Sequence, residues 1–172
     1  MLERMQHKRL NGYASLGYKM KGELMAPESV NFIFDKSNFY PVYSNDIVSA
    51  HQEILVISPF VTRRRVEQMR WQLRDAVNKG MRVTVITRRS GDFKEKDRPI
   101  LDHVFDSLKG DGIDLQFRSG IHQKCEFVDR RIVWYGSVNL LGFGGSEETM
   151  MRTESSNIAS ELLESLNLRV AV

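Results

Sequence analysis

IHQKCEFVDRRIVWYGSVN, residues 121–139, is the stretch that decides the fold of this chain. It consists of two apolar runs joined by a basic turn. His122 and Lys124 are two residues apart, so on an extended strand their side chains would point to the same face. Asp129 ends the first run, and the second run, residues 132–135, leads to Gly136, Ser137 and Asn139. If the two strands pair, these polar side chains converge in one place.

The composition is that of an ordinary soluble globular protein. The 172 residues correspond to about one domain, and 41% of them are hydrophobic while 27% are charged. No apolar run approaches the roughly 20 residues that a membrane-spanning helix needs. The first ten residues lack the apolar stretch of a signal peptide. We therefore expect a cytoplasmic protein without a membrane partner.

Charge and cysteine content narrow the possible partners. The formal net charge of +3 favours a polyanionic partner such as nucleic acid. Cys125 is the only cysteine, which excludes an internal disulfide and provides no metal cluster by itself. Its position inside an apolar run predicts a buried, unreactive thiol.

Upstream of the central stretch, the pattern predicts a βαβ unit. Residues 54–61, ILVISPFV, form a continuous apolar run and indicate a strand that is buried on both faces. A helix is predicted over residues 62–79, with an apolar stripe of Val66, Met69, Leu73, Ala76 and Val77. Residues 81–87 form a second buried strand. Because the joints are short, these two strands should be parallel, with a right-handed crossover.

The remaining segments complete an α/β fold. We expect a lead-in strand near residues 30–34, a helix over 39–50 capped by Ser44 or Asn45, a helix over 99–108, a strand over 113–118, and a strand and helix over 153–168. The prediction is a mixed central β-sheet flanked by helices. Residues 1–28, which are basic and interrupted by glycines, are predicted to be an N-terminal arm or linker, and residues 29–172 the folded domain.

The motif His122-x-Lys124, four residues, Asp129, six residues, then Gly136-Ser137-x-Asn139 resembles the HxKxxxxD and GSxN signature of the phospholipase D superfamily. The resemblance extends over about residues 44–163, with one HKD repeat in the chain. It implies a phospholipase D-like fold. The strand placement and the preceding βαβ unit make the combined signal far more specific than HxK alone.

These residue types suit phosphodiester chemistry. A nucleophile attacking an anionic diester needs nearby groups that neutralise the charge building on the phosphoryl oxygens. Lys124 offers a cation, Asn139 an amide and Ser137 a hydroxyl. A neutral imidazole at His122 can attack phosphorus and form a covalent intermediate. A second acid must then protonate the leaving oxygen.

The family resemblance also implies an assembly. Members with one motif act as homodimers, so His122 of one subunit would be the nucleophile and His122 of the partner subunit the general acid. No metal and no cofactor are implied. Asp129 would brace the hairpin. Glu154 would orient the imidazole, with Glu147 and Glu148 as alternatives.

Two arginine clusters follow the predicted parallel strands. Arg63, Arg64 and Arg65 come after residues 58–60, and the second cluster is Arg88 and Arg89. Open α/β sheets bind ligands at the carboxyl ends of their strands. We therefore expect these arginines to contact the phosphate backbone of a nucleic acid.

The leading hypothesis is a metal-independent phosphodiesterase, a nuclease acting through a phosphohistidine at a site shared by a homodimer, with DNA favoured over RNA. One alternative is a phosphatidyl transferase or phospholipase that uses the same residues. Another is a non-catalytic DNA-binding or dimerisation module of a larger helicase or restriction system, with an upstream helicase or ATPase domain as its partner.

Overall fold

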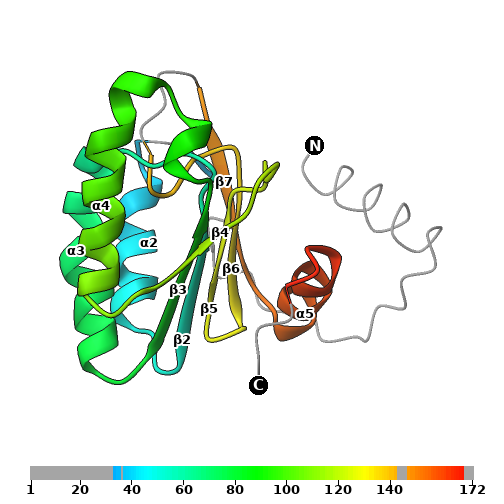
Figure 1. Cartoon of the computed structure of the whole chain (residues 1–172). Coiled ribbons are helices and arrows are strands. Elements are labelled where there is room, and N and C mark those ends of the chain that lie inside the picture. Colours follow the sequence, from blue (N-terminus) through cyan, green and yellow to red (C-terminus); the bar gives the residue numbers. More distant parts are fainter. Residues whose placement is uncertain (1–32, 36, 143–146, 169–172) are drawn as a thin grey trace, which may run out of the picture. The chain divides into compact units, whose positions relative to one another are not determined.

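The computed structural model describes residues 33–35, 37–142 and 147–168 (Figure 1). The predicted N-terminal arm, residues 1–28, lies outside these ranges. The elements are β1 (Ile33–Asp35), α2 (Phe39–Val48), β2 (Glu53–Ile57), α3 (Arg63–Asn78), β3 (Arg82–Thr87), the short 3-10 turns η1 (Ser90–Asp92) and η2 (Glu95–Asp97), α4 (Arg98–Gly110), β4 (Asp114–Phe117), β5 (Cys125–Val128), β6 (Ile132–Gly136), β7 (Thr149–Glu154) and α5 (Ser156–Ser165).

The described strands form one mixed sheet in the order β1-β7-β6-β5-β2-β3-β4. β2 pairs with β3 in parallel, and β3 pairs with β4 in parallel. The other pairs, β2 with β5, β5 with β6, β6 with β7 and β7 with β1, are antiparallel. The predicted mixed α/β sheet is confirmed, as are the parallel βαβ unit and the β5-β6 hairpin.

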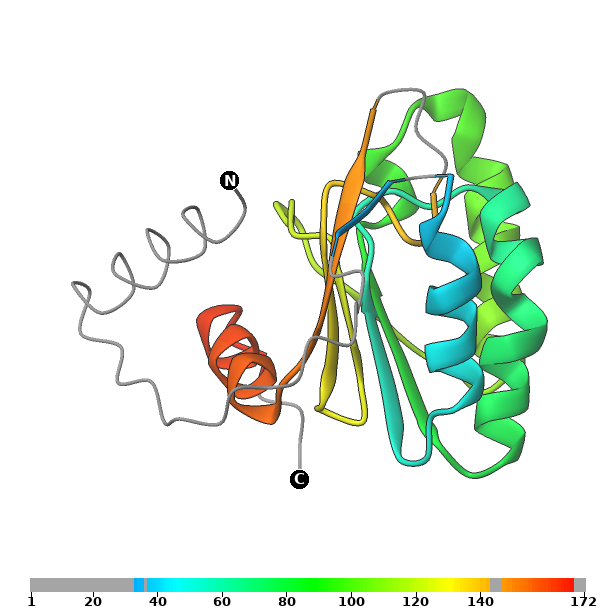
Figure 2. The ribbon, with the colours of Figure 1, turned by 180° about the vertical axis from the view of Figure 1, so that it is seen from behind.

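Helices cover both faces of the sheet. α2, α3 and α4 lie on one side and α5 on the other, as Figures 1 and 2 show from opposite directions. The central strand β2 is buried along its whole length because its side chains alternate between these layers. Ile54 and Val56 pack under α2 and α3, whereas Leu55 and Ile57 pack with α5. Residues 54–57 of the apolar run therefore have the explanation that the sequence suggested. The predicted strand over residues 54–61 is too long, because β2 ends at Ile57 and Phe60 is 48% exposed.

The start of α2 differs from the predicted caps, whereas α3 starts where it was predicted. α2 begins at Phe39, with Asn38 at the N-cap position, and so includes Pro41 in its first turn, where a missing N–H costs no intrahelical bond. The predicted caps Ser44 and Asn45 lie inside the helix. Thr62 occupies the N-cap position of α3 but makes no side-chain capping bond.

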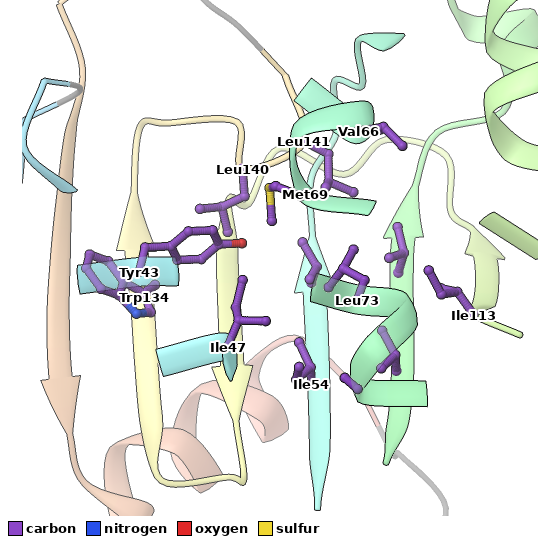
Figure 3. Packing of buried hydrophobic residues seen from close by; sticks show 14 of the residues in the cluster. Tyr43, Ile47, Ile54, Val66, Met69, Leu73, Ile113, Trp134, Leu140 and Leu141 are labelled. Atoms are coloured by element: carbon purple, nitrogen blue, oxygen red, sulfur yellow. The ribbon is translucent and has the colours of Figure 1, made fainter. Parts of the chain in front are cut away.

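A buried carboxylate fastens α2 to the sheet. Asp46 accepts a hydrogen bond from Trp134 Nε1 at 2.8 Å, and from Arg152 Nε and Nη2 at 2.7 Å and 2.9 Å. Both of its oxygens are therefore paired, which offsets the cost of burying the charge. Trp134 itself is fully buried and packs edge-on against Tyr43, as seen in Figure 3.

A second carboxylate lies deeper in the same layer. Glu126 of β5 is completely buried, and the Tyr43 hydroxyl donates a hydrogen bond to its Oε2. Burial, aided by the nearby Asp46 carboxylate and opposed by the Tyr43 hydrogen bond, raises the pKa of Glu126 to about 8. A neutral carboxylic acid is therefore part of this core at neutral pH.

Candidate active site

The polar residues of the central stretch lie at one end of the central strands of the sheet. Ile57, the last residue of β2, pairs with Cys125, the first residue of β5. The N–H of Gly136, at the end of β6, donates to the Lys124 carbonyl at 3.2 Å. The start of β5 and the ends of β2 and β6 therefore meet here, and with them the segments that carry His122, Lys124, Ser137 and Asn139.

His122 and Lys124 precede the strand instead of lying on it. β5 begins at Cys125, so the prediction that His122 and Lys124 lie on the strand is wrong, and both belong to the segment directly before it. The pairing of β2 with β5 ends here because the residues that follow β2 have no N–H to offer to β5. The Ser58 N–H donates to Ile86 of β3, and Pro59 has no N–H. His122 is exposed and Lys124 half-buried, and the Lys124 Nζ donates to the His122 carbonyl at 3.0 Å.

Asn139 is held in a defined orientation. Its Oδ1 accepts a hydrogen bond from the Phe60 N–H at 3.2 Å, and its carbonyl accepts one from the Gly142 N–H at 2.9 Å. Because the side-chain oxygen faces a backbone donor, the amide NH2 is the end left to donate to a ligand. The loop that carries Asn139 is fixed further by Leu141, whose N–H donates to Ser58 Oγ at 3.0 Å.

Ser137 and Gly136 contact the neighbouring strand β7. Ser137 Oγ accepts from the Thr149 N–H at 2.9 Å and donates to the Thr149 carbonyl at 3.3 Å, so its proton is used inside the protein. A Cβ on Gly136 would lie 2.2 Å from the Thr149 carbonyl oxygen and 2.9 Å from Met150 Cα. The Gly-Ser pair therefore allows β7 to approach closely, and the exposed serine oxygen retains only acceptor capacity.

Asp129 lies at the other end of the hairpin. It has a left-handed backbone, with φ of 53°, and its carboxylate accepts hydrogen bonds from the N–H groups of His51, Gln52 and Glu53 at 2.9, 2.8 and 3.1 Å. These bonds attach the hairpin turn to the start of β2. This is a bracing position, removed from His122 by the length of β5.

The structure does not bring Glu154 to His122, which corrects that prediction. Glu154 pairs with Ile132 at the hairpin end of β6 and forms an ion pair with Arg131. Four residues of β6 separate this point from Gly136, or about 13 Å at the usual rise of a strand. Glu148 does lie at the site edge, directly before Thr149 and in the same groove as Asn139.

The arginine clusters divide between surface and core. Arg65 is only 5% exposed, donates from Nε to the Leu140 carbonyl at 3.2 Å, and has its guanidinium over the rings of Phe39 and Tyr40. It faces inward because α3 places position 65 beside Val66 and Met69 on its buried side. The prediction that Arg65 contacts nucleic acid is therefore wrong.

The other arginines remain at the surface. Arg64 and Arg89 are exposed, and Arg63 is exposed with an ion pair to Glu67 at 2.6 Å. Arg88 is half-buried, and its Nε donates to the Pro59 carbonyl at 3.1 Å. Arg63 and Arg88 border the same groove as Asn139.

That groove, of about 850 Å³, is the feature that sequence reasoning missed. It runs from Asn139 past the segment after β2 and the loop between β3 and α4, and its wall includes Phe60 and Phe93. The apolar pattern placed Phe60 inside the predicted buried strand of residues 54–61 and did not mark Phe93. The available signal was their position: both follow the carboxyl ends of parallel strands, where α/β sheets hold ligands.

Other reactive groups do not add to the site. Cys125 is buried, and burial together with the Glu126 carboxylate raises the pKa of its thiol to about 12, which agrees with an unreactive cysteine. Over residues 33–35, 37–142 and 147–168, no three side chains of His, Cys, Asp or Glu gather into a set that could hold a metal ion. Within the same ranges, no helix has the length and apolar character to cross a membrane.

Comparison with known families identifies the fold. The family model described as cardiolipin synthase, PLD-like domain, matches residues 43–168. The chain belongs to the phospholipase D superfamily. The resemblance inferred from the HKD and GSxN motifs is thereby confirmed. A sequence comparison with curated proteins finds no match.

Solved structures agree on the architecture of this phospholipase D superfamily member. Nuc from Salmonella typhimurium, a phospholipase D family member, superposes with a TM-score of 0.63 at 18% identity, over 80% of this chain and 91% of Nuc. TrmBL2 is an archaeal chromatin protein whose structure shows a mode of DNA binding. It superposes with a TM-score of 0.55 at 15% sequence identity, over 96% of this chain and 58% of TrmBL2. Phosphatidylserine synthase from Haemophilus influenzae superposes with a TM-score of 0.56 at 16% sequence identity, over 87% of this chain and 41% of the synthase.

Proposed function

We propose that this protein is a metal-independent phosphodiesterase that cleaves nucleic acid through a phosphohistidine intermediate. The observation that carries the proposal is the convergence of His122, Lys124 and Asn139 at one edge of a phospholipase D-like sheet. They supply a nucleophile, a cation and an oriented amide donor, which is the minimum set for displacement at an anionic phosphorus.

The first step forms a covalent bond. The unprotonated His122 nitrogen attacks phosphorus, the P–O bond to the leaving strand breaks, and the leaving oxygen takes a proton. The Lys124 ammonium and the Asn139 NH2 neutralise the charge on the non-bridging oxygens. In the second step water attacks the phosphohistidine, the P–N bond breaks, and the water's proton returns to the acid that gave one.

Among the described residues, the segments that meet at this end of the sheet carry no second histidine. Of the described histidines, His51 lies at the far end of the hairpin beside Asp129, and His103 is exposed on α4. A homodimer solves the problem, since His122 of the partner subunit would protonate the leaving oxygen. We further propose that Glu148, rather than Glu154, orients the imidazole, because Glu148 directly precedes β7 at the Gly136 end of β6, whereas Glu154 lies at the hairpin end.

Nucleic acid is the proposed substrate class because four arginines that are exposed or half-buried, Arg63, Arg64, Arg88 and Arg89, follow the carboxyl ends of the parallel strands, and the cations of the groove outnumber its carboxylates by one. The likeness of TrmBL2 to this chain is compatible with DNA as a ligand. DNA is favoured over RNA on this ground alone.

Two alternatives keep specific support. The fold of phosphatidylserine synthase is compatible with phosphatidyl transfer by the same residues. The fold of TrmBL2 is compatible with a non-catalytic DNA-binding module, including one attached to a helicase or ATPase. Hydrolysis of diester substrates tests the second alternative, because a non-catalytic module would bind DNA without cleaving a diester.

The test is hydrolysis of bis(p-nitrophenyl) phosphate and of end-labelled oligonucleotides in EDTA. We expect wild-type turnover, a loss of at least about 10³-fold in His122→Ala, and no loss in the exposed control His103→Ala. Wild type quenched in alkaline detergent should carry a phosphoryl adduct that is stable to base and labile to acid. Failure of wild type to cleave either substrate while it binds DNA would contradict the enzyme. A monomer by sedimentation during turnover would contradict the shared site.

A further inference from the structure

The groove beside Asn139 is walled by two phenylalanine rings joined to an arginine. The Phe60 and Phe93 rings meet edge to face, with centroids 5.9 Å apart at an interplanar angle of 88°. The Arg88 guanidinium carbon lies 4.2 Å from the Phe60 centroid and 5.0 Å from that of Phe93. We call these three residues the aromatic platform. Phe60 is nevertheless 48% exposed, so part of its ring faces the groove and remains available for contact with a ligand.

The aromatic platform is built from fixed parts. The Arg88 Nε donates to the Pro59 carbonyl at 3.1 Å, which anchors the guanidinium to the residue before Phe60. The carbonyls of Gly91 and Phe93 accept from Arg98 Nη2 and Nε, each at 3.2 Å, so α4 holds the loop that carries Phe93. A flat ligand could bind here without first ordering these side chains, which removes much of the entropic cost of binding.

The platform adjoins the candidate active site through Asn139, whereas His122 and Lys124 do not line the groove. The Phe60 N–H is the donor that orients the Asn139 side chain, and both residues line the same groove. A phosphate bound by the Asn139 NH2 would therefore lie at the groove that Phe60 also lines. In a nucleic acid, the group attached next to the phosphate is a nucleoside.

The charges of the groove favour the base rather than further phosphates. Its wall carries four cations, Arg63, Arg88, Lys94 and Lys96, and three carboxylates, Asp92, Asp97 and Glu148. Four against three leaves a net charge near +1, and the Arg63 guanidinium is also paired with Glu67. Such a mixed wall attracts several phosphates weakly. Aromatic rings and a guanidinium plane are instead the surfaces on which unpaired bases stack.

We propose that the aromatic platform binds an unpaired nucleobase next to the scissile phosphate, so that the substrate is single-stranded nucleic acid or an unpaired end. This rests on the proposed function and deepens it by naming the substrate form. A duplex keeps its bases stacked on one another and offers no free base face to Phe60. The proposal therefore assigns a strand preference, which the motif residues do not determine.

The competing occupant of an apolar groove is a lipid chain. Ile100 and Leu101 contribute apolar surface to the wall. An acyl chain would gain no benefit from a guanidinium fixed against a ring, whereas a base stacks on both. Short-chain phospholipid therefore serves as an outcome of the test.

The experiment measures binding without cleavage, in the His122→Ala full-length protein. Two fluorescent 12-nucleotide strands with the same number of phosphates are compared by anisotropy: oligo-dT and an oligomer of abasic residues. We expect the abasic strand to bind about five- to one-hundred-fold more weakly, since each stacked base contributes that much. Equal affinity for the two strands would overturn the proposal, and this comparison needs no change to the platform.

Variants locate the effect. Phe60→Leu should abolish the difference between the two strands, and Phe60→Tyr should retain it. Trp71→Leu is the matched control, because Trp71 is 55% exposed on α3 and does not line the groove. A folded Phe60→Leu protein that still discriminates, or a Trp71→Leu protein that no longer does, would contradict the assignment. So would competition by dihexanoyl phosphatidylglycerol that Phe60→Leu abolishes.

The two proposals can fail separately. Hydrolysis of bis(p-nitrophenyl) phosphate with equal binding of the two strands would refute the aromatic platform and leave the phosphodiesterase. Base-dependent binding without hydrolysis of any diester would refute the phosphodiesterase and leave a single-strand binding site.

Discussion

Glu126→Gln tests the buried carboxylic acid of the core through the pH dependence of stability. Glu126 is fully buried, its Oε2 accepts a hydrogen bond from Tyr43, and its Oε1 has no hydrogen-bond partner among the residues that the structure describes. With water excluded, the charged form is disfavoured, and the pKa rises from an ordinary 4.5 to about 8.

The sign and size of the effect follow from proton linkage. Below pH 4.5 the carboxyl carries its proton in both folded and unfolded chains. Between pH 4.5 and about 8 the unfolded chain releases the proton while the folded chain retains it, so stability falls as pH rises. At about 1.4 kcal/mol per pH unit, the loss approaches about 5 kcal/mol at pH 8 and does not grow further.

The assay is urea unfolding of both proteins from pH 5 to pH 9. Glutamine cannot ionise, so the free energy of unfolding of Glu126→Gln minus that of wild type should rise by several kcal/mol over this interval. The unpaired glutamine NH2 lowers the stability of the variant at every pH by about 1–3 kcal/mol without changing the slope. Glu67→Gln, exposed on α3, is the control for the change in charge. A pH-independent difference for Glu126→Gln would refute a protonated core carboxyl.

Asp129→Ala removes the acceptor for three backbone N–H groups and places alanine at a positive φ, so urea unfolding should show a loss of about 2–4 kcal/mol, whereas Asp129→Asn retains most of the stability. Gly136→Ala forces the Thr149 backbone away and should cost at least about 1–3 kcal/mol in thermal unfolding, together with diesterase activity. Arg89→Ala should reduce the slope of log affinity for single strands against log salt by about 0.7, while Arg65→Met leaves this slope unchanged and lowers the melting temperature. An unchanged slope in Arg89→Ala would contradict a contact of Arg89 with the nucleic-acid backbone, and a reduced slope in Arg65→Met would contradict the core position of Arg65.

The helices and most strands could be predicted because their information is local. The apolar stripe of residues 66–77 and the unbroken apolar run of β2 depend on a period of 3.6 or 2 residues that any reader of the sequence can count. The family could be predicted for a related reason: the spacing of His122, Lys124, Ser137 and Asn139 is itself a property of the chain. So is Asp129, whose place at the hairpin turn follows from the charged break between two apolar runs.

What local patterns could not supply was the partner of each segment. Glu154 follows the GSxN motif in the chain, yet the register of β7 on β6 places it at the hairpin end, while Glu148 stays near Asn139. Arg65 reads as part of a basic run, but the rotation of α3 turns it into the core. A shift of one residue in strand register, or a rotation of 100° about a helix axis, decides whether a side chain faces the site or the core. Register and rotation are set by the packing of the folded chain.

The sequence by itself determined which chemical groups this protein has and which kind of sheet presents them. The tertiary structure alone decided which groups share an edge. It joined Phe60, Phe93 and Arg88, from separate segments, into a surface beside Asn139, because the parallel pairing of β2 and β3 brings their carboxyl ends together. Contacts between residues far apart in sequence arise from strand pairing and burial, and these are properties of the folded chain as a whole.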